Sequence, residues 1–475
     1  MYNDRVHEGD VQVPSGFVLG AATAAYQIEG GATEGGRGPS IWDTFSHTPG
    51  KIAEGANGDV AADHYHHVDE DLDLMASLHL DAYRFSISWS RILPTGEGDV
   101  NPAGLQFYSR LIDGLVARGI EPVVTLNHWD LPQALEDKYG GWRGRETAYA
   151  FERYAEVVGE ALGDRVAIWA THNEPWNNSY SGYGSGAFAP GGSSHADALR
   201  AVHHLNLAHG LGVMALRRTV TRADAQVGVV LNVLRIEAET PADEEAARRA
   251  DAVANRAFTG PMLRGAYPDD LLEDTRHLTD WSFVEPGDLR ICHQPIDVLG
   301  VNYYEVMHVR LNPEVTPAHC STGGTDFPGS EHVEIVRPEE LERTAMDWGV
   351  EPRGLEELLV SLSKEYPELP VMVMENGAAF DDVVLDEGDG PIVLDVDRVR
   401  YLSAHVAATL RARSRGANVV GYLVWSLLDN FEWALGYGPR FGIIRVDYKT
   451  QERTPKLSSH WFAELCRSRR VPELL

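Results

Sequence analysis

Two glutamates stand where a carboxylate would do chemistry. Glu174 follows the apolar run RVAIWATHN from Arg165, and Glu375 ends the run PVMVM from Pro370. A charge at the end of a hydrophobic strand is costly unless a site needs it. Two carboxyl groups that flank one atom can hydrolyse a glycoside: one protonates the leaving oxygen, and the other attacks the anomeric carbon or activates water. For either glutamate alone, a structural pair with a neighbouring arginine remains the alternative.

Aromatic and polar residues gather at the ends of other apolar runs. The flat apolar face of a sugar ring packs against indole, and its hydroxyls need fixed donors and acceptors. A tryptophan alone is more often core filling, so the group counts only beside the two glutamates. The tryptophans are Trp129, Trp176, Trp425 and Trp433, and the polar residues are Gln27, His128, Asn173 and Glu432.

Eight short apolar runs alternate with longer segments of helical periodicity, such as residues 147–162 and 194–219. This alternation is typical of βα units, so we expect an α/β fold: a single (β/α)8 TIM barrel, one domain over residues 1–475, with long loops at the C-terminal face. Side chains at strand ends then share one rim, with the fourth and seventh strands facing each other. The runs are GFVLGAA from Gly16, AYRFSIS from Ala82, EPVVTLN from Glu121, RVAIWATHN from Arg165, QVGVVLN from Gln226, IDVLGVNYY from Ile296, PVMVMEN from Pro370 and VVGYLVWSL from Val419.

Two stretches fit no simple βα unit. Residues 313–343 follow the sixth run, and residues 381–395 follow the seventh. The second, DDVVLDEGDGPIVLD, is acidic and contains glycine. We expect both to be long loops, and the second to be a solvated surface excursion.

Charge and cysteine usage exclude several classes of partner. Lysine and arginine number 41 against 71 aspartates and glutamates, a net charge of −30 that repels nucleic acids and anionic membranes. The three cysteines show no CxxC spacing, and neither a signal peptide nor a membrane-spanning run is visible. We therefore expect a cytoplasmic chain without nucleic-acid or membrane partners.

No motif calls for a metal or a cofactor. The cluster of His64, His66 and His67 offers ligands at short spacing, but it is better explained as the start of a helix. The glycines between Gly30 and Gly38 lack the Lys-Ser/Thr of a phosphate-binding loop. We expect neither a metal nor a cofactor.

Taken together, these segments resemble family 1 of the glycoside hydrolases along nearly the whole chain. A single tripeptide is weak, whereas eight segments in order with barrel spacing are specific. They are FVLGAATAAYQIEG from Phe17, YRFSISWSRI from Tyr83, LNHWDLP from Leu126, NEP from Asn173, GVNYY from Gly300, ENG from Glu375, WSLLDNFEWALGY from Trp425 and FGIIRVDY from Phe441.

The resemblance implies a retaining β-glucosidase that acts on oligosaccharides or aryl glucosides, with β-galactosyl and β-fucosyl groups as further substrates and with polysaccharide and cellulose degradation as its setting. It implies that Glu174 is the general acid and base, that Glu375 is the nucleophile, and that Arg84 and Tyr304 hold the nucleophile. The substrate-binding residues it implies are Gln27, His128, Trp129, Asn173, Glu432 and Trp433 around the non-reducing sugar, Trp425 beneath its ring, Phe441 at the side of the pocket, and Trp348 on the aglycone side.

Some alternatives remain open. A transglycosylase would use the same residues, and an inactive sugar-binding relative would usually lack one catalytic glutamate. Asn178, Tyr180 and Tyr183 are further candidates for aglycone contact, and His172, which precedes the NEP motif, either perturbs the pKa of Glu174 or fills space. The acidic Glu432 and the net charge favour unphosphorylated sugars. The oligomeric state is left open.

Overall fold

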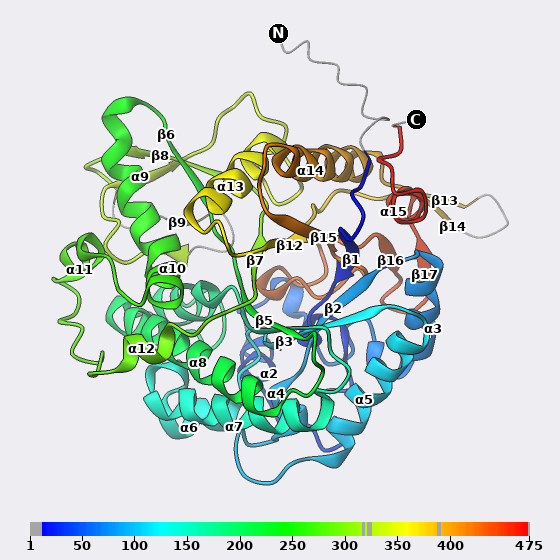
Figure 1. Ribbon diagram of the computed structural model, residues 1–475, viewed down its shortest axis with the longest axis horizontal. Coiled ribbons are helices and arrows are strands. Elements are labelled where there is room, and N and C mark those ends of the chain that lie inside the picture. Colours follow the sequence, from blue (N-terminus) through cyan, green and yellow to red (C-terminus); the bar gives the residue numbers. More distant parts are fainter. Residues whose placement is uncertain (1–11, 316–318, 321–324, 387–390, 474–475) are drawn as a thin grey trace.

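The computed structural model describes residues 12–315, 319–320, 325–386 and 391–473. At its centre eight parallel strands close into a barrel, in the order β1-β15-β12-β7-β5-β4-β3-β2 (Figure 1). Each strand lies within one of the eight apolar runs, so the expected (β/α)8 barrel is confirmed. The strands are β1 (Val18–Ala22), β2 (Ala82–Ser86), β3 (Glu121–Asn127), β4 (Ile168–Asn173), β5 (Gln226–Leu231), β7 (Val298–Asn302), β12 (Val371–Asn376) and β15 (Val419–Trp425).

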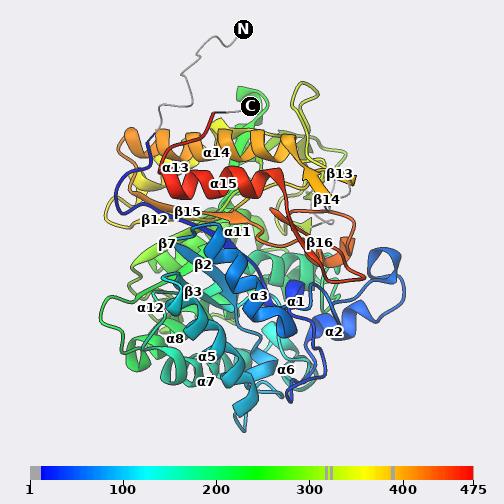
Figure 2. The ribbon, with the colours of Figure 1, turned by 90° about the vertical axis from the view of Figure 1, so that its right-hand side faces the viewer.

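Helices surround the barrel, as Figure 2 shows from the side. The segments predicted at 147–162 and 194–219 are helices α7 and α8, which pack against each other. Gly163 ends α7, and the Ser194 hydroxyl caps α8 by accepting from the Asp197 amide. The long helices are α3 (His64–Ser77), α5 (Pro102–Ala117), α7 (Arg145–Leu162), α8 (His195–Thr219), α13 (Pro352–Glu365), α14 (Val396–Ser414) and α15 (Leu457–Ser468).

Shorter elements lie mainly in the connections between strands and helices. The helices among them are α1 (Ala25–Ile28), α2 (Ile41–Ser46), α4 (Trp89–Ile92), α6 (Gln133–Tyr139), α9 (Glu244–Asp251), α10 (Ala257–Thr259), α11 (Asp269–Thr275) and α12 (Asp288–Cys292). The strands among them are β6 (Arg235–Ala238), β8 (Val306–Leu311), β9 (His319–Cys320), β10 (Thr325–Asp326), β11 (Val333–Val336), β16 (Ile444–Val446) and β17 (Arg453–Pro455). Within the described ranges, no helix has the length and apolarity needed to cross a membrane.

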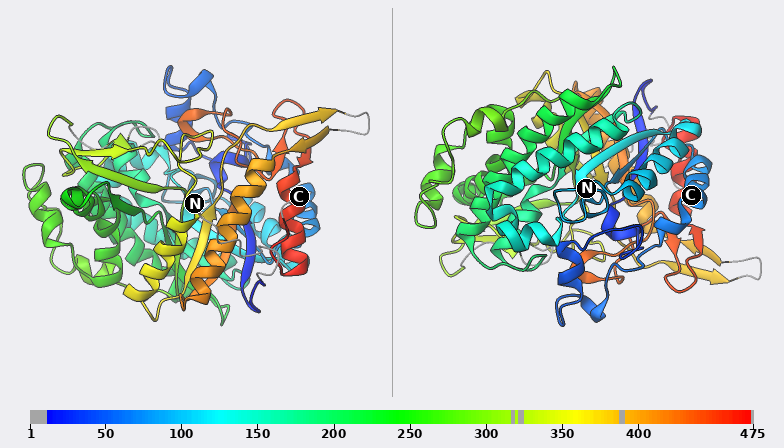
Figure 3. Two further views of the ribbon diagram at one scale, coloured as in Figure 1. Left: turned by 90° about the horizontal axis from the view of Figure 1, so that it is seen from above. Right: turned by 90° about the horizontal axis from the view of Figure 1, so that it is seen from below.

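The two stretches predicted as loops contain strands. β11 pairs with β8 in a small sheet, which contradicts a pure loop at 313–343, although 316–318 and 321–324 lie outside the described residues. In the second stretch, β13 (Val383–Asp386) and β14 (Pro391–Leu394) form an antiparallel hairpin that projects beyond the helices (Figure 3, left). Its physical basis is visible in the sequence: two aliphatic, β-branched runs flank a glycine-containing segment. The predicted exposure of this second stretch to solvent is confirmed, because Val383 and Ile392 are exposed.

Inside the barrel, small and aliphatic residues pack below a polar upper layer. Ala82, Val123, Ile168 and Leu423 belong to this inner core. Arg84 lies two residues after Ala82, on the same face of β2, and is fully buried. Because the barrel is filled below, only its C-terminal end offers space for a ligand.

Candidate active site

Glu174 and Glu375 lie at the C-terminal ends of β4 and β12, and both are buried. Glu375 pairs with Asn302 at the last register position that β12 shares with β7. Glu174 directly follows β4 with a φ of 44°, in the left-handed region that a residue with a side chain rarely adopts. Its amide donates to the Val230 carbonyl at 2.9 Å, which fixes this conformation. Such backbone strain is typical of functional positions.

Donors of two kinds hold the Glu375 carboxyl group. The Arg84 guanidinium donates to Oε1 at 2.6 Å, and the Tyr304 hydroxyl donates to Oε2 at 2.8 Å. Arg84 is itself fixed by donating to Thr125 Oγ1 and to Asn173 Oδ1. Burial raises the pKa of Glu375, whereas Arg84 and Tyr304 lower it. The cation in contact therefore favours the ionised form of Glu375.

Among the described residues, two amides and no cation contact the Glu174 carboxyl group. Asn302 donates to Oε1 at 2.8 Å, and Asn177 donates to Oε2 at 2.7 Å. Burial, followed by the charge of Glu375, raises the pKa of Glu174 to about 8. The two carboxyl groups thus differ in their partners, and the proton that the pair holds near neutral pH belongs on Glu174.

The two glutamates line a cavity that opens to solvent. Its walls are rich in aromatic rings, and none of the described residues that line it is lysine or arginine. Most residues predicted to bind substrate line it: Gln27, His128, Trp129, Trp348, Trp425, Glu432, Trp433 and Phe441, with Tyr304 beside them. Asn173 and Arg84 are not lining residues and lie behind the carboxyl groups, in contact with each other.

Polar atoms at one side of the cavity have no hydrogen-bond partner among the residues that the structure describes. Gln27 Oε1 and His128 Nδ1 are buried without a hydrogen bond, while Gln27 Nε2 donates to Asn430 Oδ1 at 2.9 Å. Burial, together with Glu375, raises the pKa of Glu432 to about 8, and burial holds the pKa of His128 well below its usual range. A buried polar atom without a partner is rare unless a ligand supplies one. Hydroxyl groups, which both donate and accept, fit this side.

The aromatic walls are fixed by ring contacts. Trp433 stacks on Tyr26 at 6.1 Å between ring centroids and meets Trp129 at 4.6 Å. On the opposite side, Trp348 lies 5.1 Å from Tyr304 and 5.9 Å from Phe441. Each of these rings contacts another ring, so the walls keep their shape without a ligand.

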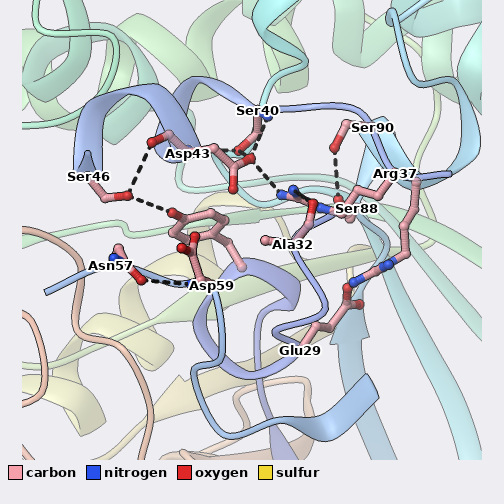
Figure 4. Close-up of polar contacts among 12 residues, drawn as sticks. Glu29, Ala32, Arg37, Ser40, Asp43, Ser46, Asn57, Asp59, Ser88 and Ser90 are labelled. Carbon is pink, nitrogen blue, oxygen red and sulfur yellow. Dashed lines mark hydrogen bonds and ion pairs between the residues drawn. The ribbon is translucent and has the colours of Figure 1, made fainter. Parts of the chain in front are cut away.

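A polar cluster fastens the segment that follows helix α1, the helix in which Gln27 lies (Figure 4). Arg37 donates to Asp43 at 2.9 Å, and the Asp43 carboxylate in turn accepts from the Ser40 amide at the start of α2. The Ser46 hydroxyl at the end of α2 bonds the Tyr26 hydroxyl at 3.0 Å. Because Tyr26 stacks on Trp433, this cluster supports the wall of the cavity from behind.

Several predicted contacts lie elsewhere. Asn178, Tyr180 and Tyr183 are buried in the π-helix Asn177–Gly184 and do not line the cavity, so the expected aglycone contact is wrong for them. Tyr180 instead donates to the Val253 carbonyl at 2.9 Å, and Tyr183 donates to Glu136 Oε2 at 2.6 Å. Large residues that follow a strand end can anchor a loop as readily as they can face a ligand.

His172 and His64, two of the histidines considered above, have structural partners. His172 stacks on Phe151 at 4.7 Å and bonds Asn127, so it fills space behind the site. His64 bonds Asp71 at 2.7 Å, and Asp71 also accepts from Arg453. Among the described residues, no group of three or more potential ligands is arranged to hold a metal ion.

Two amides were missed by the sequence reasoning. Asn302 ends the strand of the GVNYY segment, and this position at a strand end was a usable signal. Asn177 follows Trp176 in a connection, and nothing in its local pattern marked it. Both contact Glu174.

An ionised carboxylate and a protonated carboxyl group in one aromatic cavity can perform nucleophilic attack and proton donation on a sugar. Comparisons with known proteins agree with this chemistry. The sequence profile of Glycosyl hydrolase family 1 matches residues 10–471.

Three similar proteins are named as beta-glucosidases. The bifunctional beta-D-glucosidase/beta-D-fucosidase of Bifidobacterium breve is 48% identical over 455 residues, covering 94% of this chain and 97% of that protein. The thermostable beta-glucosidase B of Thermobispora bispora is 48% identical over 460 residues, covering 97% and 91%. The crystal structure of the psychrophilic beta-glucosidase BglU from Micrococcus antarcticus superimposes with a TM-score of 0.90 at 48% identity, covering 96% of this chain and 98% of that chain.

Proposed function

Because this chain belongs to glycosyl hydrolase family 1, we propose that its cavity cleaves terminal, non-reducing β-D-glucosyl residues by a retaining mechanism. The chain is a glycoside hydrolase of the β-glucosidase type, and its substrate is a β-glycoside. One observation carries the assignment of roles: among the described residues, a cation and a phenol donate to the Glu375 carboxyl group, whereas two amides donate to that of Glu174.

In the first half-reaction, the ionised Glu375 attacks the anomeric carbon, and the bond from that carbon to the leaving oxygen breaks. Glu174 gives its proton to the leaving oxygen, so the aglycone departs as a neutral alcohol. Arg84 and Tyr304 hold the attacking carboxylate in place before the covalent bond forms. The product of this step is a glycosyl ester of Glu375.

In the second half-reaction, water attacks the same carbon and releases Glu375 as a carboxylate. Glu174 is now ionised and takes the proton of that water. The ester carries no charge, so the repulsion that raised the pKa of Glu174 is gone, and the same group is a carboxylate when a base is required. Two displacements on opposite faces retain the β-configuration.

Gln27, His128 and Glu432 supply the polar side of the sugar subsite. The unpartnered Gln27 Oε1 and His128 Nδ1 are the atoms that we assign to sugar hydroxyls, with Trp425, Trp433 and Trp129 as the walls. Phe441 and Trp348 border the aglycone side. Asn173 supports the sugar subsite from behind, because its side-chain amide bonds His128 Nε2 at 3.1 Å.

The cavity favours an uncharged sugar. The described lining residues include four glutamates, Glu174, Glu305, Glu375 and Glu432, and no lysine or arginine that could pair with a phosphate. The relative from Bifidobacterium breve is named for both glucosidase and fucosidase activity, which supports β-fucosyl groups as second substrates. A cytoplasmic role in polysaccharide degradation, with short cellulose fragments as substrates, completes the proposal; free Cys292 and Cys466 support a reducing compartment.

Two variants test the assignment of roles. Glu375→Gln should lose turnover of every aryl β-glucoside while its thermal unfolding stays cooperative. Glu174→Ala should keep activity on 2,4-dinitrophenyl β-glucoside, whose leaving group needs no proton, and azide should accelerate it and yield the β-glucosyl azide. An α-glucosyl azide, identified by NMR, would overturn the retaining mechanism.

A further inference from the structure

Asn177 is placed to act on the carboxyl group that handles the proton. It is the first residue of the π-helix Asn177–Gly184, and its side chain is buried at the wall of the cavity. Its Nδ2 donates to Glu174 Oε2 at 2.7 Å. The Ser181 hydroxyl, one turn later, donates to Asn177 Oδ1 at 3.3 Å, which orients the amide so that its nitrogen faces Glu174.

We propose that Asn177 is a positioning residue that sets the proton affinity of Glu174 and thereby balances the two half-reactions. This inference rests on the proposed function, in which Glu174 is the acid and then the base. Asn177 itself transfers no proton, because an amide does not titrate.

The physical basis is the direction of the hydrogen bond. A donor that points at a carboxylate stabilises the ionised form, and it must give way or reorient when that oxygen carries a proton. Asn302 donates to the other oxygen, Oε1, and lowers the pKa of Glu174 in the same way. Asn177 therefore opposes the acid that the first half-reaction needs, and it holds the carboxylate that the second half-reaction needs.

The charged and titratable groups around Glu174 come from several elements. Burial and the charge of Glu375 on β12 raise the pKa of Glu174, whereas the amide of Asn302, Arg84 on β2 and the amide of Asn177 lower it. Tyr304 after β7, His128 after β3 and Glu432 after β15 line the same cavity. Of the groups around Glu174, only Glu375 changes its charge during turnover. The effect of Asn177 on the proton affinity of Glu174 is therefore constant, and it adds to the effect of that change.

The test uses Asn177→Leu, which keeps the shape of the side chain and removes the donor. With a substrate whose leaving group needs protonation, such as an alkyl β-glucoside, the basic limb of the kcat/KM profile should move up by about one pH unit. With 2,4-dinitrophenyl β-glucoside, for which the second half-reaction limits turnover, kcat should fall about 10-fold while KM falls with it. Substitution of a residue with a purely structural role would neither move the basic limb nor lower kcat and KM together.

Asn178→Ala is the matched control, because Asn178 is the next buried amide of the same helix and accepts from Asn127 at 3.2 Å without touching Glu174. It should lower stability and leave the basic limb in place. Asn177→Ala, which adds no bulk, replaces the leucine variant if that variant does not fold.

A basic limb that stays at the wild-type pH in both Asn177 variants would overturn the inference. The proposed function fails in a different way, namely if Glu174→Ala keeps wild-type turnover of alkyl glucosides. The two failures are therefore distinguishable.

Discussion

At the scale of single residues, the proposed chemistry depends on contacts that give two glutamate side chains different protonation states. Glu174 and Glu375 share burial, and they differ in what donates to them. Arg84 supplies the only guanidinium or ammonium group that the structure shows in contact with either carboxylate within the described residues. Separate roles for the two glutamates follow from that one contact.

The proton on Glu174 predicts the pH dependence of the first half-reaction. Because its pKa is raised to about 8, kcat/KM for alkyl β-glucosides should fall as pH rises above about 8, when the acid is lost. The same profile measured with 2,4-dinitrophenyl β-glucoside should lack most of this fall. Equal declines for both substrates would assign the limb to another group.

Tyr304→Phe removes one donor to Glu375 and keeps the ring that packs on Trp348. A hydrogen bond to a charged group contributes about 1.5–3 kcal/mol, so kcat/KM should fall about 10–100-fold. Steady-state kinetics on an aryl β-glucoside measure the loss, and an unchanged melting temperature shows that packing is intact. Wild-type kcat/KM would mean that this hydrogen bond does not support the nucleophile.

At the scale of elements, strands place the reacting groups and the connections after them shape the pocket. Two of these connections are joined by a buried cluster of charges behind the site. Lys456 Nζ lies 2.8 Å from Asp382, which follows β12, and 2.8 Å from Asp429, which follows β15. Arg398 on α14 pairs with Asp395 and Asp382 and donates to the Arg440 carbonyl, next to Phe441.

Lys456→Met should destabilise the fold, because it leaves the buried Asp382 and Asp429 without their shared cation. Breaking a buried ion pair from one side costs about 3–5 kcal/mol. Urea unfolding followed by fluorescence measures the change in free energy. Lys449→Met is the control, since Lys449 is exposed, and it should change that free energy by less than about 0.5 kcal/mol. Equal effects of the two substitutions would contradict a role for the cluster.

At the scale of the whole molecule, buried titratable groups make stability depend on pH. Burial raises the pKa of Glu174, Glu432 and Asp130 to about 8. Each holds a proton in the folded chain that the unfolded chain has lost above about pH 4.5. Burial also lowers the pKa of five histidines, which the unfolded chain protonates below about pH 6.5: His128, His172, His204, His209 and His405.

Stability should therefore peak near pH 6 and decline toward pH 8. Below the peak, unfolding takes up protons on the histidines, and above it, unfolding releases protons from the carboxyl groups, each contributing a slope of about 1.4 kcal/mol per pH unit. Denaturant unfolding at pH 6, 7 and 8 measures the curve. Glu432→Gln removes one of these carboxyl groups and should flatten the decline between pH 7 and pH 8; an identical decline in the variant would contradict its part in it.

The sequence by itself determined the barrel and singled out the two glutamates to which we assign the reaction. Alternation of short apolar runs with helical segments reports burial, and burial is a local property of each strand. Glu174 and Glu375 could be found because a charge that closes an apolar run is conspicuous. The hairpin of β13 and β14 was also within reach of this reasoning, since its two β-branched runs flank a glycine-containing segment. That the whole chain is one domain stays a prediction.

Only the tertiary structure decided which groups touch. Arg84 lies 291 positions before Glu375 in the chain and Asn302 lies 128 after Glu174, so no local pattern pairs them. The same holds for Asn177, whose amide turns toward Glu174 because Ser181 and the π-helix orient it, and for Tyr180 and Tyr183, which turn away. Composition and periodicity fix which side of an element is buried. The protonation of two neighbouring carboxyl groups depends instead on donors brought together from strands far apart in the chain.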